Sequence, residues 1–142
     1  MPATPQPAGY SGTPLPKKLG IKPGHTLVIL DAPADFDALL TPLPDDVTIR
    51  RDLRAKSPID VAIAFATTSD RMAARVGTLR TRIAPNGAIW CAWPKRASGV
   101  PTDITEDVVR QIAFEHTLVD NKVCAIDATW SGLRLVIRLK DR

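Results

Sequence analysis

Uninterrupted apolar runs, rather than alternating ones, mark the interior strands of this chain. Residues 27–30, 61–66 and 88–93 are apolar at every position. A strand that is apolar on both faces is buried between two layers, as in a parallel sheet covered by helices. With three further segments that are shorter or less continuous, the pattern predicts six strands, over residues 25–30, 47–50, 60–66, 88–93, 118–126 and 133–139.

Two intervening segments have the 3.6-residue repeat of amphipathic helices. In residues 70–83 the apolar positions form one stripe, which consists of Met72, Val76, Leu79 and Ile83. A second such helix is predicted from Thr105 to Glu115, with acids in its first turn, where the helix dipole favours them. Shorter helical turns are predicted at residues 13–20 and 34–40.

A polar row lies beside the apolar stripe of the first helix and consists of Arg71, Arg75, Thr78 and Arg82. An ordered row of arginines could contact phosphate. A solvated outer face explains such a row more simply, because charged side chains of amphipathic helices are mostly exposed. We therefore predict that these arginines face solvent.

The order of the elements indicates an α/β sheet with one connecting helix missing. About eight residues separate strand 47–50 from strand 60–66, whereas a helical crossover takes about a dozen or more. One face of the sheet should therefore be thinly covered, and the amino-terminal turn or a second copy of the chain would have to cover it. Alternating apolar residues from Leu133 onward predict a last strand that is antiparallel to strand 118–126.

Composition bounds the size and the compartment of the protein. At 142 residues, with 44% apolar and 24% charged residues, the chain suits one globular domain. Residues 1–9 contain three prolines among small or polar residues, which predicts a disordered tail ahead of a single domain over residues 10–142. No apolar run approaches the ~18 residues of a membrane span, so we expect a cytoplasmic protein without membrane contact.

Charge and cysteine usage restrict the partners further. The net charge of +4 permits an anionic partner without requiring one. Basic residues are spread along the chain without the interleaved aromatic residues of a base-stacking surface, so nucleic-acid binding is disfavoured. Cys91 and Cys124 lack the spacing of a metal site or redox motif, and we interpret both as buried thiols and expect no metal.

Parallel strands separated by helices and closed by an antiparallel hairpin resemble the core of class I methyltransferases that use S-adenosylmethionine. The likeness is strongest over residues 59–139. It implies a Rossmann-like three-layer α/β sandwich with a six-stranded, mostly parallel sheet in the order 2-1-3-4-6-5. Only the sixth strand would be antiparallel, and the core would be truncated. The same order implies that a strand separates Cys91 from Cys124 and prevents a disulfide.

Two departures from that family argue against its cofactor. Its first strand ends in an acid followed by alternating glycines, which let the backbone approach the cofactor. Here Asp31 keeps the acid, but residues 32–35 contain no glycine and Pro33 restricts the backbone. The family's second strand ends in an acid that holds ribose hydroxyls, whereas this chain has Arg50 and Arg51. We therefore expect no S-adenosylmethionine and no other cofactor.

Three segments also resemble a family of short bacterial proteins known only as a domain of unknown function. They are GYSGTPL at residues 9–15, WPK at residues 93–95 and CAIDATWSGL at residues 124–133. This likeness covers nearly the whole chain. It implies no particular activity.

The candidate site lies where the first, third and fourth strands end, because ligands of α/β sheets usually bind at the carboxyl ends of strands. The ligand-binding candidates are Asp31, Ala32, Pro33, Thr67, Thr68, Trp93, Lys95 and Arg96. We expect Asp31 to hold Lys95 when no ligand is bound, and residues 97–102 to form a movable rim. Lys95 could equally be a solvated loop lysine, and no residue is assigned a catalytic role.

Two functions of different class remain open. The first is a non-catalytic, methyltransferase-like module that binds a protein partner or an anionic small molecule. The second is a small enzyme that uses Lys95 and Asp31 in the strand-end cleft. A homodimer through the thinly covered face is compatible with the first. The absence of the cofactor motif favours a protein that is not an enzyme.

Overall fold

The computed structural model describes residues 12–142, so the predicted tail over residues 1–9 and the first two positions of the predicted domain lie outside the described residues. Within that range a six-stranded sheet has the order β2-β1-β3-β4-β6-β5, as predicted. Its strands are β1 (Thr26–Leu30), β2 (Thr48–Arg50), β3 (Ile59–Phe65), β4 (Ile83–Pro94), β5 (Leu118–Ala125) and β6 (Trp130–Ile137).

The strand directions also match the prediction. β1 is parallel to β2 and β3, and β3 is parallel to β4. β6 is antiparallel to both of its neighbours, β4 and β5. Because β6 separates the strands that contain Cys91 and Cys124, the two thiols are too far apart to pair, and both are free.

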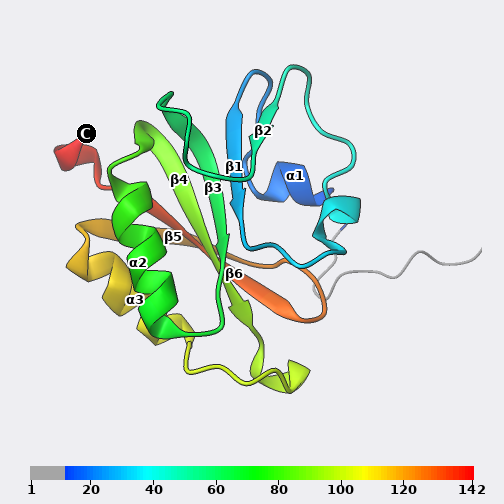
Figure 1. Cartoon of the computed structure of the whole chain (residues 1–142), viewed down its shortest axis with the longest axis vertical. Coiled ribbons are helices and arrows are strands. Elements are labelled where there is room, and N and C mark those ends of the chain that lie inside the picture. The colour runs from blue at the N-terminus through cyan, green and yellow to red at the C-terminus, as the bar shows by residue number, and fades with distance from the viewer. Residues whose placement is uncertain (1–11) are drawn as a thin grey trace, which may run out of the picture.

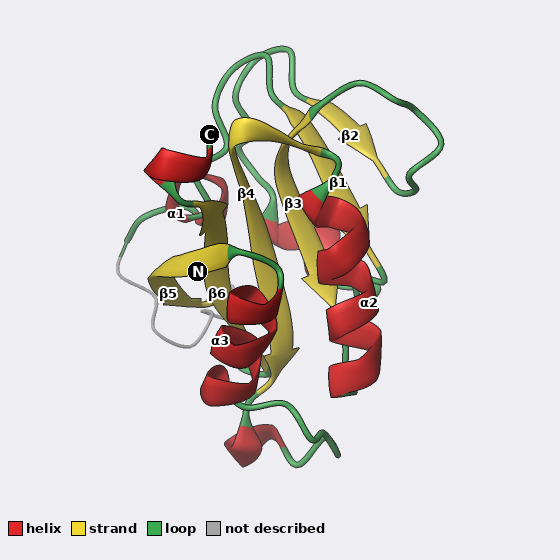
Figure 2. Cartoon of the chain, turned by 90° about the vertical axis from the view of Figure 1, so that its left-hand side faces the viewer, coloured by secondary structure: helices red, strands yellow, loops and turns green. Residues whose placement is uncertain are grey.

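Helices cover the two faces of the sheet unequally. α2 (Ser69–Arg80) and α3 (Glu106–Glu115) lie on one face, here called the α2 face (Figures 1 and 2). Within residues 12–142, the helical cover of the opposite α1 face consists of the short helix α1 (Leu15–Lys18) and the 3-10 turn η1 (Phe36–Leu39) (Figure 1). Two further 3-10 turns are η2 (Arg96–Ser98) and η3 (Leu139–Asp141). The α1 face is therefore the thinly covered one.

The α2 face is covered because both long helices present apolar stripes to it. Val76 and Leu79 of α2 are buried in one cluster with Val109 and Ile112 of α3. Alternate residues of β4 and β6 complete this cluster from the sheet side. The predicted apolar stripes of the two helices are thus confirmed, apart from the helix ends.

A few large side chains close the α1 face. Leu15 and Leu19 of α1 and Phe36 of η1 are buried in one cluster with residues of β1, β3 and β4. The indole N–H of Trp90 donates to the Leu19 carbonyl at 2.9 Å, which ties α1 to the middle of the sheet. The amino-terminal turn therefore covers the face opposite to the helix-free connection over residues 51–58, whose Leu53 packs on the α2 face.

The end of α2 and the start of β4 differ from the prediction. The helix ends at Arg80 rather than at residue 83, and Ile83 already pairs with Ile59 as part of β4. The register shifts after this pair, so residues 84–87 bulge within the strand instead of forming a separate turn. Apolar spacing extended the predicted helix too far because Ile83 is buried in the same cluster as the helix stripe.

The carboxyl-terminal strand is also displaced from its predicted position. β6 begins at Trp130, three residues before the predicted strand, and ends at Ile137. Leu139, predicted to be the last buried position, lies in η3 and is 80% exposed. The alternating pattern marks the core of the strand but not its ends.

A β-bulge interrupts the edge strand β5. Asp120 pairs with Leu135 and Lys122 pairs with Arg134, so the two strands advance by different numbers of residues. Asn121 is the extra residue on β5. Such a bulge bends the strand locally and increases its twist.

The connection over residues 51–58 crosses the α2 face without a helix, as predicted. The Arg82 guanidinium donates to the carbonyl oxygen of Leu53 at 3.0 Å and also to that of Ala55. Leu53 packs against the core of the α2 face. The prediction that the arginine row faces solvent is therefore wrong for Arg82, which holds this connection in place.

We predict that Gly87→Ala destabilises the protein by roughly 2–3 kcal/mol, because the added Cβ forces the backbone of a packed sheet to move. That Cβ would lie 2.8 Å from the carbonyl oxygen of Ile59 and 3.0 Å from that of Ala84. Urea denaturation monitored by circular dichroism measures the change. The control is Gly24→Ala, where the Cβ has free space and only the positive φ opposes it, at a cost of about 1 kcal/mol. Equal losses in the two variants would contradict the close approach.

Candidate functional site

The candidate residues lie at one edge of the sheet, because β1, β3 and β4 are parallel neighbours whose carboxyl ends meet there. The structure divides them between two pockets instead of a single cleft. The Asp31 pocket, of about 250 Å³, is lined by Asp31, Phe65, Ala66, Thr67, Thr68, Arg71 and Trp130. The Lys95 pocket, of about 480 Å³, contains Trp93, Lys95 and Arg96 together with parts of residues 99–106 and Ser131.

Two arginines of α2 hold the Asp31 carboxylate. Arg71 and Arg75 each donate to its Oδ2 atom, at 3.1 and 3.0 Å. Burial alone would raise the pKa of Asp31, but the hydrogen bonds and charges of the two arginines outweigh it and lower that pKa. Asp31 therefore pairs with α2 and not with Lys95, which corrects the predicted partner. Arg71 is nevertheless exposed to solvent as predicted, whereas the Arg75 side chain is only 28% exposed.

This ion pair spans the crevice where the sheet changes direction. The chain leaves β1 toward η1 on the α1 face, and it leaves β3 toward α2 on the other face, so the two connections diverge between these strands. Asp31 has a positive φ of 61°, a conformation that Asp tolerates better than most residues. In this conformation its carboxylate reaches across to α2. We call this arrangement the Asp31 clamp.

Aromatic side chains fill the space beside the clamp on the α1 face. Phe36 packs edge to face against Phe65 with ring centroids 4.9 Å apart, and Phe65 packs in the same way against Trp130 at 5.1 Å. Phe36 is fully buried. Ala32 packs against the same cluster, so neither Ala32 nor the nearby Pro33 lines the two strand-end pockets. In the segment that replaces a glycine loop, Ala32 therefore contacts the core, whereas Ala34 and Asp35 are exposed.

The two candidate threonines have structural contacts. Thr68 caps α2, since its hydroxyl accepts the backbone N–H of Arg71 at 3.3 Å. The Thr67 carbonyl accepts a hydrogen bond from the Thr102 hydroxyl at 2.7 Å. Asp103 accepts from both the backbone N–H and the hydroxyl of Ser69, at 2.7 and 2.8 Å, which lowers the pKa of Asp103. These bonds fix one end of the rim that was predicted to move.

The Lys95 pocket combines an apolar floor with basic side chains. Trp93 is almost completely buried, and Ile104 beside it is buried as well. Lys95 is partly exposed and Arg96 is exposed, so both ammonium and guanidinium groups can meet a ligand from water. Ser131 of the hairpin also lines the pocket, and no pattern in the sequence predicts its presence there.

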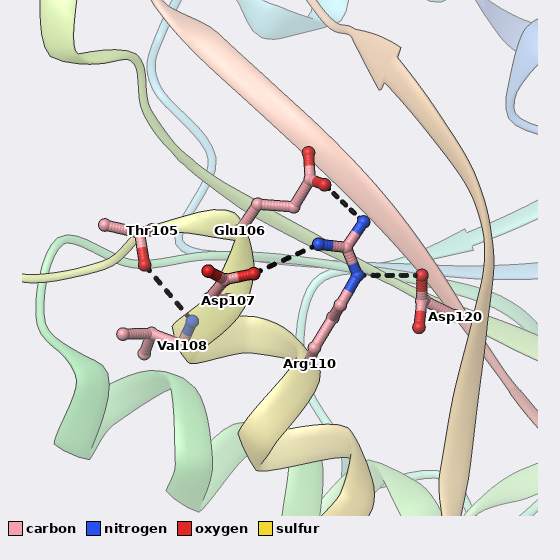
Figure 3. A network of polar contacts seen from close by, with 6 residues as sticks. All are labelled: Thr105, Glu106, Asp107, Val108, Arg110 and Asp120. Atoms are coloured by element: carbon pink, nitrogen blue, oxygen red, sulfur yellow. Dashed lines mark hydrogen bonds and ion pairs between the residues drawn. The ribbon is translucent and has the colours of Figure 1, made fainter.

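An acidic network borders this pocket at the start of α3 (Figure 3). Arg110 contacts Glu106, Asp107 at 3.2 Å and Asp120 at 3.2 Å. The hydrogen bonds from Arg110 to Asp120 and Glu106 raise the pKa of the arginine. Glu106 itself lines the pocket, but because it is paired with Arg110, its charge opposes a bound anion less than that of an unpaired carboxylate would. Thr105 caps the same helix.

Of the two arginines at the end of β2, Arg51 has an acidic partner, whereas Arg50 forms no ion pair within residues 12–142 and its Nε is buried without a hydrogen-bond partner. Arg51 makes a two-point ion pair with Asp37 of η1, at 3.0 and 2.9 Å. This pair joins β2 to η1 on the exterior of the sheet. It leaves a basic residue where the methyltransferase pattern has a ribose-binding acid.

Two kinds of site are missing from the described part of the chain. Over residues 12–142, no group of three or more His, Cys, Asp or Glu side chains gathers as metal ligands would. None of the helices in the same range is long and apolar enough to cross a membrane.

Solved structures with a similar fold are S-adenosylmethionine-dependent methyltransferases. One from Aquifex aeolicus is 14% identical with a TM-score of 0.61, over 87% of this chain and 88% of that one. Magnesium protoporphyrin IX methyltransferase from Synechocystis PCC 6803 is 12% identical with a TM-score of 0.56, over 82% and 75%. The ribosomal protein L11 methylase of Lactobacillus delbrueckii subsp. bulgaricus is 11% identical with a TM-score of 0.55, over 86% and 74%.

These likenesses identify the fold class and nothing finer. No family model matches the chain, and no curated protein matches it in sequence. The chain therefore has a methyltransferase-like Rossmann fold, as its strand order implied. The connection from β2 to β3 contains no helix. The likeness to a domain-of-unknown-function family rests on the three sequence segments alone.

We predict that Asp31→Asn lowers stability at pH 7 by about 0.5–1 kcal/mol, the range of partly exposed ion pairs. Asn tolerates the positive φ as Asp does, so the variant removes only the charge. The folded-state pKa of Asp31 lies below its unfolded value, so the clamp stabilises the protein above about pH 4 and is lost as pH falls through the folded pKa. Urea denaturation from pH 7 to pH 3 should show the two proteins converging at low pH. A constant difference across this range would contradict the ionic clamp. Asp52→Asn, at a weak exposed pair, is the control with little effect.

Proposed function

We propose that this protein is a non-catalytic, methyltransferase-like module that binds an anionic small molecule in the Lys95 pocket. The observation that carries the proposal is the pocket itself, in which Lys95 and Arg96 stand over a floor of Trp93 and Ile104. Such a site suits a ligand with an apolar body and one anionic group, such as an aryl phosphate or aryl carboxylate.

Three features support a role without S-adenosylmethionine. The Asp31 clamp places an ion pair across the crevice in which nucleotide-type ligands of this architecture bind and leaves only a pocket of about 250 Å³ beside it. Phe36 fills the space behind it, where a glycine-rich loop would leave room for a cofactor. Arg51 stands at the end of β2 and is held by Asp37. Each feature opposes the cofactor by occupying volume or by presenting the wrong charge.

The alternative, an enzyme that uses Lys95 and Asp31 together, has less support. The two residues line different pockets, and the Asp31 carboxylate is occupied by two arginines with a lowered pKa. A carboxylate in that state is a weak general base. We place the binding module in the cytoplasm, since its two free thiols suit a reducing compartment.

S-adenosylmethionine should not bind specifically. Isothermal titration calorimetry of the chain with S-adenosylmethionine should give no saturable heat up to millimolar ligand, because residues 32–35 contain no glycine and Arg51 stands at the end of β2 in place of an acid. The magnesium protoporphyrin IX methyltransferase of Synechocystis, whose solved structure has S-adenosylmethionine bound, is the positive control. Micromolar affinity for the present chain would overturn the proposal of a module without this cofactor.

Binding to the Lys95 pocket should depend on its two basic side chains. In a titration with phenyl phosphate followed by ¹H–¹⁵N NMR, we expect shifts at residues 93–106 and an affinity that falls with salt. Lys95→Ala combined with Arg96→Ala should weaken binding about tenfold, as expected for two charge contacts that are open to water. Lys56→Ala combined with Lys140→Ala removes the same charge from exposed positions outside the pocket and should leave the affinity unchanged. Equal affinity in all three proteins would refute the site.

A further inference from the structure

A second basic pocket lies between α1 and the edge strand β5. It has a volume of about 590 Å³ and is lined by Thr13, Lys17, Lys18, Lys122, Val123, Cys124 and Ala125. None of these residues lines the Lys95 pocket or the Asp31 pocket. The space is thus a separate feature of the molecule, on the thinly covered face.

The fold brings its lysines together from distant parts of the sequence. Lys17 and Lys18 form the last turn of α1, whose position is set by the hydrogen bond from Trp90 to Leu19. Lys122 follows the bulge of β5 and donates from Nζ to the Lys18 carbonyl at 2.9 Å. This bond caps the end of α1 and holds the Lys122 ammonium group at the pocket.

The charge of this pocket is not balanced by protein groups. Its lining contains three ammonium groups and no carboxylate. Across residues 12–142 no carboxylate lies within 4.0 Å of the charged nitrogen of these lysines, and residues 1–11 contain no acidic side chain. Burial raises the pKa of Cys124 despite the opposing charges of Lys18, Lys122 and Lys95, so this thiol stays neutral and supplies no negative charge at neutral pH.

We propose that this pocket binds a small polyanion of the diphosphate class. Lysine ammonium groups act as point charges with three donors each, which suits the several oxygens of a compact phosphate group. Thr13 adds a hydroxyl at the rim. The pocket has room for a diphosphate and lacks the tryptophan floor of the Lys95 pocket, so the two sites select different anions. This inference does not rest on the proposed function, because the two sites share no residue.

Inorganic pyrophosphate is the first probe. Calorimetric titration at about 20 mM salt should show binding to the full-length protein that weakens steeply as salt is raised. Lys17→Gln combined with Lys18→Gln should weaken it at least tenfold. Glutamine keeps a helix propensity close to that of lysine, and the Lys122 bond to the Lys18 carbonyl uses only the backbone, so this variant should retain the fold. Circular dichroism checks that it does.

Charge-matched controls separate a site from general attraction. Lys56→Gln combined with Lys140→Gln lowers the net charge equally at exposed positions and should leave pyrophosphate affinity within about twofold of the wild type. Lys95→Ala combined with Arg96→Ala should likewise retain the pyrophosphate site. Equal loss in every double variant, or no loss in the Lys17 and Lys18 variant, would overturn the proposal.

Cys124 provides a local and independent readout. It lines the pocket, whereas Cys91 is completely buried and burial raises its pKa to about 12. Saturating pyrophosphate should slow iodoacetamide alkylation of Cys124 at least threefold in the wild type and not in the Lys17 and Lys18 variant, as measured by peptide mass spectrometry. Alkylation of Cys124 that is insensitive to bound pyrophosphate would place the anion elsewhere and reject the site.

The same titration with ADP identifies the source of the diphosphate. Tighter binding of ADP than of pyrophosphate, still dependent on Lys17 and Lys18, supports a site for the diphosphate of a nucleotide. Tighter binding of pyrophosphate supports a free polyphosphate. Binding of ADP that ignores the lysine substitutions would contradict recognition through this pocket.

Discussion

The Asp31 clamp determines how the strand-end edge of this protein can be used. One carboxylate at the end of β1 accepts hydrogen bonds from two arginines of α2, so it joins the end of a central strand to the helix that covers the α2 face. In an open α/β sheet the diverging connections at this point leave a crevice for a ligand. Here the crevice is spanned by an ion pair and supported from behind by Phe36 and Phe65. A pocket of about 250 Å³ remains beside the clamp, and the larger strand-end pocket, of about 480 Å³, lies at the end of β4.

Much of the fold could be predicted because buried strands and amphipathic helices leave periodic patterns in the sequence. The runs at residues 27–30, 61–66 and 88–93 all lie in interior strands, and the strand order follows from the likeness to methyltransferases. The ends of the elements were harder to predict. Ile83 is buried whether it ends a helix or begins a strand, so hydrophobicity alone does not distinguish the two.

The candidate site was predicted in position but not in its internal contacts. Parallel neighbours bring Asp31, Thr67 and Lys95 to one edge of the sheet, which pattern and topology suffice to predict. The partners of these residues depend on side-chain reach. The sequence predicts that Arg71 and Arg75 face solvent, because the spacing of residues along a helix does not indicate which loop lies opposite them. The bond from Asp103 to Ser69 links polar residues 34 positions apart, and such contacts leave no periodic signal.

The bulge in β5 changes which face of the sheet the exposed side chains of this edge strand occupy. Val119 pairs with Val136 and Val123 pairs with Leu133, and cross-strand partners share a face. Leu133 and Val136 are three residues apart in β6, so their side chains point to opposite faces of the sheet. Their partners Val123 and Val119, both exposed, therefore lie on opposite faces as well. In a regular strand, two residues four positions apart would share a face. The exposed apolar side chains of the edge strand β5 therefore do not form a continuous row on either face. A strand from another molecule would meet a bent backbone with single valines on either side, which is a poor template for the growth of intermolecular sheets.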